Sequence, residues 1–379
     1  MRVSMSWGTP MWVLFVILAI VMLIKVKPKL VGEFHEDFLS LQVSKGILGI
    51  SAILIILHHI SQKFGTSTSA GALHVLEDFG VCFVGLFFFF SGYGLMKSVR
   101  KKDNYLKGFL KRRYASILIP FYVCIIIFVV YNIWKGAKYN SHDLLNFLSG
   151  WILLNTHMWY IVEIAVLYLA FYIVNRLVKN KGVMIGIMAV LVILMMIGSL
   201  LLGHGKYWFQ GEWWYNTSFL FVIGMMIANW EETIVAFVKR WYYLVLVVFL
   251  GLFIVFYKAT MYMLKAHSYW SEVPGVTKGY QDKFMTLSCQ LPMVIAFVLL
   301  ILLITMKIQF KNKILDFLGM ISLEIYLLHG LFLDLFSTPG KIVFEDPFLY
   351  AIAVVIASII LATVVHYICK FLISLIVRK

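Results

Sequence analysis

The chain has 379 residues, of which 62% are hydrophobic and only 13% are charged, and its mean hydropathy is +0.91. This composition excludes a soluble domain, in which about half of the residues are apolar and about a quarter are charged. The net charge of +15 does not indicate a nucleic-acid-binding protein, because the 33 Lys and Arg residues lie in short connectors between apolar runs.

Apolar runs long enough to cross a bilayer as helices recur along the whole chain. They predict an all-α integral membrane protein with about eleven transmembrane helices. The run at 215–230 is the shortest, since it rises only about 24 Å against a hydrocarbon core of about 30 Å. The expected spans are 10–26, 45–62, 79–97, 114–134, 158–178, 183–203, 215–230, 241–260, 285–306, 315–337 and 348–376.

The distribution of basic residues predicts how these spans are oriented. With the N-terminus outside and the C-terminus in the cytoplasm, more than two thirds of the Lys and Arg residues fall in cytoplasmic connectors. The connector 97–113 is far more basic than orientation requires, and it suits either the phosphates of a nucleotide-bearing donor or anionic lipid headgroups. Its cations are Lys97, Arg100, Lys101, Lys102, Lys107, Lys111, Arg112 and Arg113.

Ionisable side chains inside a membrane are costly, so those in the predicted spans are candidate functional residues. On the second span, Lys45 and His59 lie about 21 Å apart along the helix axis and share one face, whereas His58 points elsewhere. A thin substrate could lie on that face between the cation and the imidazole. A pair of interface histidines, hydrogen-bonded to loop carbonyls, explains His58 and His59 equally well.

The third span combines an apolar wall with small residues. Four consecutive phenylalanines at 87–90 precede Ser91, Gly92, Tyr93 and Gly94. This pattern predicts a close backbone approach and a local break in the helix, which a membrane tolerates only where protein or a cavity faces the break. Packing between helices through small residues is the alternative.

The fifth span carries polar groups in its outer half. It begins near His157 and Trp159 and places Glu163 at about the depth of His59. A carboxylate there could orient the imidazole, as the third member of a nucleophile, base and orienting set does. Glu163 is therefore a candidate catalytic partner of His59.

The tenth span carries one polar stripe, formed by Ser322, Tyr326 and His329, with Glu324 on the opposite side. Such a stripe either lines a path or joins helices. We expect no metal site, because the sequence has no HExxH motif and its histidines are dispersed.

Five motifs, in this order, resemble the acyltransferase-3 family of integral membrane O-acyltransferases. The resemblance extends from about residue 40 to 375, and the first and last motifs are the most specific. The family has ten spans, so residues 1–35 look like an extra N-terminal helix with its connector, and 36–379 like the acyltransferase domain. The motifs are Gly49-Ile50-Ser51-Ala52 to His59, Gly85-Leu86-Phe87-Phe88-Phe89-Phe90-Ser91-Gly92-Tyr93, Lys111-Arg112-Arg113 before Pro120, His157-Met158-Trp159-Tyr160, and Leu318-Gly319-Met320-Ile321-Ser322-Leu323-Glu324-Ile325-Tyr326-Leu327-Leu328-His329.

The resemblance implies transfer of an acyl group, usually acetyl, from cytoplasmic acyl-CoA to a hydroxyl of an extracytoplasmic glycan or other cell-envelope acceptor. His59 matches the family's essential histidine, which acts as a general base or as a transient acyl carrier. Acyl-CoA would be a donor substrate rather than a permanently bound cofactor. The protein would be a multi-pass protein of a cell membrane, as in the cytoplasmic membrane of bacteria, and membrane lipid would surround it.

The resemblance also assigns roles to further residues. Donor binding would fall to Lys45, Arg100, Lys111, Arg112 and Arg113. The acyl path would run past Phe88, Ser91, Gly92 and Tyr93. The residues of an acceptor site or structural polar stripe would be His58, His157, Trp159, Ser322, Tyr326 and His329.

Two positions depart from the family pattern, and both concern donor binding. Leu48 stands where the family has an arginine, eleven residues before the histidine, and Lys45 lies one turn earlier on the same face. Ser116 stands where a second arginine lies close before the proline. A transporter or flippase of a glycan or lipid-linked intermediate is the alternative function, although we find no inverted repeat. Its buried carboxylates would be Glu163, Glu324 and Asp334.

Overall fold

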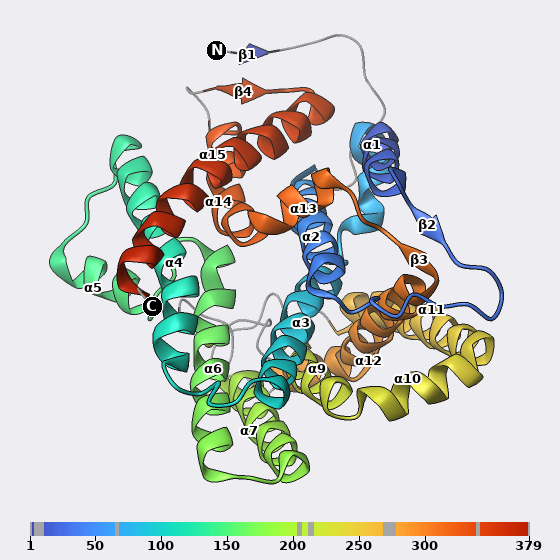
Figure 1. Cartoon of the computed structure of the whole chain (residues 1–379). Coiled ribbons are helices and arrows are strands. Elements are labelled where there is room, and N and C mark those ends of the chain that lie inside the picture. Colours follow the sequence, from blue (N-terminus) through green and yellow to red (C-terminus); the bar gives the residue numbers. More distant parts are fainter. Residues whose placement is uncertain are drawn as a thin grey trace.

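The computed structural model describes residues 2–3, 11–64, 68–202, 207–210, 216–267, 278–338 and 342–377. Within these ranges the chain forms a bundle of α-helices with two 3-10 helices and four two-residue strands. Figure 1 shows α2 and α3 near the centre of the bundle. The helices are α1 (Trp12–Leu23), α2 (Leu41–Phe64), η1 (Thr68–Leu76), α3 (Gly80–Lys101), α4 (Phe109–Trp134), α5 (Ser141–Ser149), η2 (Thr156–Met158), α6 (Trp159–Leu177), α7 (Lys181–Leu202), α9 (Phe219–Asn229), α10 (Glu231–Arg240), α11 (Tyr242–Ala266), α12 (Lys278–Lys307), α13 (Lys313–Met320), α14 (Ser322–Leu335) and α15 (Pro347–Ile376). The strands are β1 (Arg2–Val3), β2 (Lys27–Pro28), β3 (Ile308–Gln309) and β4 (Val343–Phe344).

The structure confirms an all-α membrane protein. Eight of the described helices are long and apolar enough to cross a membrane, and up to ten spans result if each of two bent pairs counts as one. Each of the eleven expected spans overlaps at least one described helix, but α1 is too short to be counted among these spans. Helix α1 has 12 residues, a rise of about 18 Å that is less than the thickness of the hydrocarbon core.

Two pairs of helices are bent, α13 with α14 over the expected span 315–337, and α9, at the expected span 215–230, with α10, which follows that span. Helices α9 and α10 meet at 85°, and α13 and α14 meet at 72°. The expectation of one straight helix over 315–337 is therefore wrong, because the chain turns at Ile321. At this bend the Ser322 hydroxyl donates to the carbonyl of Gly319 at 3.2 Å, which satisfies a group released from the regular helix ladder.

The central helices α2 and α3 bury most of their side chains, whereas α11 buries very few and leaves the others half-buried or exposed. Helix α3 is continuous from Gly80 to Lys101, so the predicted break near Ser91 is wrong. The predicted close approach is confirmed. A Cβ atom on Gly92 would lie 1.9 Å from the carbonyl oxygen of Phe221 on α9, which shows that the two backbones pack directly against each other.

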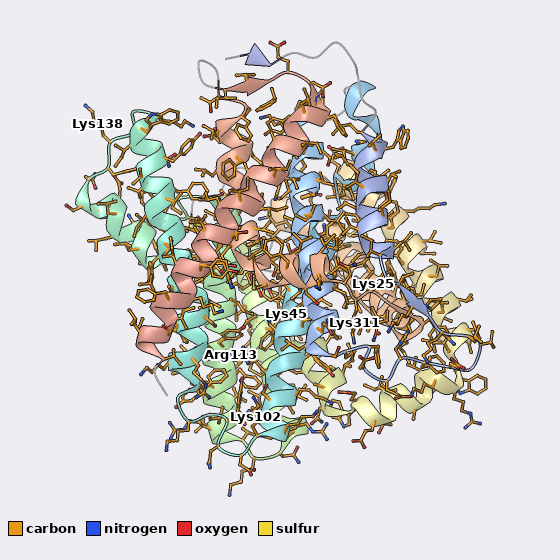
Figure 2. The ribbon with its side chains drawn as sticks, turned by 45° about the horizontal axis from the view of Figure 1, so that its top comes forward. Lys25, Lys45, Lys102, Arg113, Lys138 and Lys311 are labelled. Atoms are coloured by element: carbon orange, nitrogen blue, oxygen red, sulfur yellow. The ribbon has the colours of Figure 1, made fainter. Side chains whose placement is uncertain are left out.

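Each of two small sheets joins a pair of connectors that the predicted orientation places on the same side of the membrane. Strand β1 pairs in parallel with β4, and β2 pairs antiparallel with β3. Near β3, Lys311 and Gln309 bind Asp37, and the hydrogen bond from Lys311 lowers the pKa of this carboxyl group. Figure 2 shows Lys138 toward the end that carries β1 and β4 and Lys102 at the opposite end. These pairings agree with the predicted alternation of connectors.

Replacing Gly92 with valine should destabilise the bundle, because its side chain would meet the carbonyl of Phe221, which belongs to the backbone and cannot rotate away. We expect a loss of about 1–3 kcal/mol or more, measured as a lower apparent Tm in detergent. Gly94→Ala on the same helix is the control, since a Cβ there has no neighbour within 4 Å. Equal Tm values for the two variants would contradict direct packing of α3 on α9.

Candidate active site

Three histidines from distant parts of the chain meet at one point of the bundle. His59 lies on α2, His157 on η2 and His329 on α14. The centroids of their rings are 4.1 Å apart for His59 and His157, 4.6 Å for His157 and His329, and 5.2 Å for His59 and His329. The histidines are dispersed in the sequence, but the fold gathers these three.

Hydrogen bonds fix the tautomers of two of these rings. His59 donates from Nδ1 to the Oε1 atom of Gln62 at 3.1 Å, and His329 donates from Nδ1 to the carbonyl of Tyr326 at 2.7 Å. Because both partners are acceptors, Nδ1 carries the proton and Nε2 keeps a lone pair in each ring. The Nε2 atom of His329 is buried and has no hydrogen-bond partner among the described residues.

His58 has a different environment from His59. Its Nδ1 atom bonds the carbonyl of Leu76 in η1 at 2.8 Å, and its side chain is buried. The alternative reading of a histidine that binds a loop carbonyl is therefore correct for His58. Its ring also contacts Gly80 at the start of α3, so His58 joins η1 and α3 to α2.

A cavity of about 280 Å³ opens beside the histidines. Tyr326 contributes a buried hydroxyl that has no hydrogen-bond partner among the described residues. The cavity thus combines an imidazole with a free lone pair and a hydroxyl that can donate. Its lining residues are Ile55, His58, His59, Gln62, Gly80, Val81, Val84, Thr156, His157, Trp159, Asn216, Thr217 and Tyr326.

A second, apolar cavity of about 220 Å³ lies along the preceding turns of α2. Ile47 and Ser51 line this cavity, and Ile55 and His59 line the histidine cavity. These four residues follow one another at intervals of four, so the two cavities occupy one slowly turning stripe of the helix surface. The stripe begins near Lys45, which is exposed.

Comparison with known families identifies the class of this membrane protein. The acyltransferase-3 family model, described as an acyltransferase domain, matches residues 46–367. The chain belongs to this family. The match covers more than four fifths of the chain and includes all three clustered histidines and Tyr326. Comparison with curated proteins and with solved structures found no match.

Glu163 of this acyltransferase-3 protein has a different partner from the expected one. Its side chain is fully buried on α6, where it accepts a hydrogen bond from the hydroxyl of Ser218. The structure gives Gln62, rather than Glu163, as the hydrogen-bond partner of the His59 ring. We therefore correct the expected orienting role of Glu163, because the group that holds His59 lies one turn away on α2 itself.

The four residues expected along the acyl path do not line the histidine cavity. The Phe88 ring packs on Tyr160 with centroids 4.9 Å apart, and the Ser91 hydroxyl lies 3.2 Å from the Tyr160 hydroxyl. Gly92 packs on α9, and Tyr93 donates to Glu231 at 2.8 Å. From α3, Gly80, Val81 and Val84 line the histidine cavity, and Phe83 and Leu86 line the apolar cavity.

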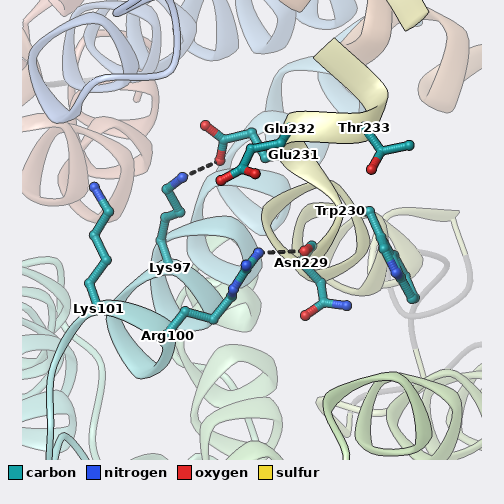
Figure 3. Close-up of a pocket in the computed structure, with 8 residues that line it drawn as sticks. All are labelled: Lys97, Arg100, Lys101, Asn229, Trp230, Glu231, Glu232 and Thr233. Atoms are coloured by element: carbon teal, nitrogen blue, oxygen red, sulfur yellow. Dashed lines mark hydrogen bonds and ion pairs between the residues drawn. The ribbon is translucent and has the colours of Figure 1, made fainter. Parts of the chain in front are cut away.

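Several basic residues of the acyltransferase bind backbone carbonyl groups or carboxylates of the same chain. Arg100 donates to the carbonyl of Ala228 at 2.8 Å and also to that of Asn229, and Lys97 pairs with Glu231. Figure 3 shows these side chains at the corner between α9 and α10, around a cavity of about 360 Å³. They stabilise the end of α9, where carbonyl groups lack helix partners.

The arginines at the start of α4 also make structural contacts. Arg112 donates to the carbonyls of Tyr105 and Lys107, each at 2.7 Å, and Arg113 donates to the Tyr105 hydroxyl at 3.1 Å. Lys111 is exposed beside them. Of the expected donor-binding residues, Lys45 and Lys111 therefore have the side chains most accessible to a ligand.

Two of the carboxylates considered for a transporter are paired. Glu324 lies 3.0 Å from the Nδ1 atom of His366 on α15. Asp334 accepts from the Tyr131 hydroxyl at 2.7 Å and pairs with Lys135. These contacts join α14 to its neighbours, which is the structural use of polar groups in a membrane bundle.

The contact between His58 and Gly80 can be tested with a double-mutant cycle. Gly80→Ala should lower the apparent Tm, because a Cβ there would lie 2.4 Å from the Nε2 atom of His58. Adding His58→Ala should relieve this clash, so the double variant should be more stable than the sum of the two single effects by about 0.5–3 kcal/mol. Strictly additive effects would show that the His58 ring does not face Gly80.

Proposed function

We propose that this acyltransferase moves an acetyl group from cytoplasmic acetyl-CoA to a hydroxyl of an extracytoplasmic glycan or other cell-envelope acceptor. The single observation that carries the proposal is the tautomer of the His59 ring together with its position in the histidine cavity. Its ring lines the histidine cavity, and the bond to Gln62 leaves the Nε2 lone pair available. A neutral imidazole with a free lone pair is a general base.

The proposed reaction uses two side chains of the cavity. His59 takes the proton from the acceptor hydroxyl through Nε2 while the acceptor oxygen forms a bond to the thioester carbonyl carbon. The hydroxyl of Tyr326 donates to the oxygen that becomes negatively charged, as an oxyanion donor does. When the tetrahedral intermediate collapses, the carbon–sulfur bond breaks, and the proton on His59 passes to the departing thiolate of CoA.

The two cavities on α2 support a route for the donor. The apolar cavity lies along α2 from Gly46 to Leu54, a rise of about 12 Å at 1.5 Å per residue. A long, thin acyl-pantetheine arm matches this shape. The CoA phosphates would remain at the end of α2 that carries the exposed Lys45, and the exposed Lys111 on α4 is a second candidate cation for them.

The acceptor would approach from the opposite end of α2. The polar lining of the histidine cavity includes Gln62, Thr156 and Asn216. Hydroxyl, amide and carbonyl groups of this kind bind sugar hydroxyls, and Trp159 adds an aromatic wall. These groups favour a polyol or glycan over a purely apolar acceptor.

Replacing His59 with alanine should lower kcat for acetyl transfer by at least about 100-fold, because general base catalysis contributes about 10² to 10⁴. The measurement is CoA release from acetyl-CoA by protein in lipid nanodiscs with a panel of acceptor sugars. His142→Ala on α5 is the control, because that side chain is exposed and bonds only its own helix at Asn146. Full activity of the His59 variant would rule out the proposed base.

Tyr326→Phe should lower kcat by about 100-fold with little change in KM for either substrate, since an oxyanion donor acts mainly in the transition state. The same assay of CoA release measures both constants. The substitution removes one oxygen that has no hydrogen-bond partner among the described residues, so the apparent Tm should not fall. A raised KM with unchanged kcat would assign Tyr326 to substrate binding instead.

A further inference from the structure

The histidine cluster has the composition of a metal site. One ring nitrogen from each of His59, His157 and His329 lies within 4.8 Å of the other two. The acyl-transfer mechanism uses only His59 of this set. The Nε2 atom of His329, unpaired among the described residues, is a second observation, because a buried polar atom without a partner is destabilising unless an ion or water satisfies it.

The hydrogen bonds around the cluster also match those of metal ligands. A metal-binding histidine usually donates its other ring nitrogen to a carbonyl or carboxylate, which fixes the ring and its tautomer. His329 does so to the Tyr326 carbonyl, and His59 does so to Gln62. Both Nε2 lone pairs are thereby free to coordinate.

The donor set selects the class of metal. Three neutral imidazoles without a carboxylate suit zinc and similar transition metals, whereas magnesium and calcium require oxygen ligands. Three protein ligands leave a fourth position open, and the histidine cavity of about 280 Å³ has room for water there. Tetrahedral zinc places its nitrogen ligands about 3.3 Å apart, so the rings would close together slightly on binding.

We propose that His59, His157 and His329 bind one divalent zinc ion, and that the zinc-bound protein is inactive in acyl transfer. The inhibitory part rests on the proposed function. Zinc would occupy the Nε2 lone pair of His59 that otherwise accepts the proton of the acceptor hydroxyl. Bound zinc and acyl transfer are then mutually exclusive at this ring.

Metal binding is tested without any acyl substrate. The protein, purified in detergent with a histidine-free affinity tag, is titrated with Co²⁺, which reports coordination by its visible absorption, and zinc is then used to displace it. We expect one Co²⁺ per chain with a tetrahedral spectrum that zinc abolishes. X-ray absorption of the zinc-loaded protein should show three imidazole ligands. Absence of a saturable spectrum, or fewer imidazoles, would mean that the three rings only pack together.

Variants identify the ligands. His157→Ala and His329→Ala should each abolish the Co²⁺ spectrum, and Gln62→Ala should weaken Co²⁺ binding by about 10-fold because it removes the partner that orients His59. His142→Ala is the exposed control and should leave the spectrum unchanged. Each variant is checked by size-exclusion chromatography and apparent Tm. An unchanged spectrum in a folded His157 or His329 variant would overturn the site.

The regulatory part is tested separately by CoA release. Zinc at concentrations that saturate the Co²⁺-competition curve should inhibit at least about 10-fold, and a chelator should restore the rate. Full activity with the site loaded, or activity that requires zinc, would overturn the inhibition. If the metal-free protein has no transferase activity while Co²⁺ binds as expected, the proposed function fails but the metal site stands.

Discussion

The proposed function of this bundle depends on one interaction, the contact between the imidazole rings of three histidines. A polar ring at membrane depth must be satisfied by protein or by an aqueous cavity. Here α2, η2 and α14 each bring one ring to the cluster, and the rings from α2 and η2 line the histidine cavity. A Cβ atom on Gly330 would lie 2.8 Å from the His157 ring, so α14 and η2 approach so closely only because this residue is glycine.

Away from the three histidines, the charged side chains make structural contacts that hold helices and connectors together. Basic residues at the end of α3 hold the corner between α9 and α10, and Arg112 at the start of α4 holds the connector before it. The carboxylates Glu324 and Asp334 are used in contacts between α14 and its neighbours. The two cavities on α2 lie along successive turns of this helix, the apolar cavity from Gly46 to Leu54 and the histidine cavity from Ile55 to Gln62.

The sequence predicted the membrane class, the family and the positions of the spans, because apolar length and motif order are local properties. It did not predict the bend at Ile321 or the continuity of α3 through Gly92, since both depend on which neighbour packs there. The three histidines were found individually, but their contact was not. His59 and His329 fall in the outer halves of their expected spans and His157 immediately precedes the outer end of another, but depth alone does not show which side chains meet.

Partners of individual side chains were the least predictable features. Glu163 and His59 share a depth, yet Ser218 and Gln62 are their hydrogen-bond partners, since rotation of each helix about its axis decides which groups meet. The residues expected along the acyl path lie further along α3 than the residues of this helix that line the histidine cavity, and their partners are Tyr160, Phe221 and Glu231. A hydrophobic segment buried on nearly all sides has no polar face that would reveal its orientation.

Transfer across the membrane is the most direct test of the proposed function. Proteoliposomes with the protein in one orientation receive radiolabelled acetyl-CoA on the side of the connector 97–113 and an impermeant acceptor glycan on the other side. The proposed reaction predicts labelled acceptor on the far side and free CoA on the near side, in equal amounts and only when both substrates are present. Labelled acceptor without CoA release, or transfer only when both substrates share one side, would contradict a route along α2 to His59.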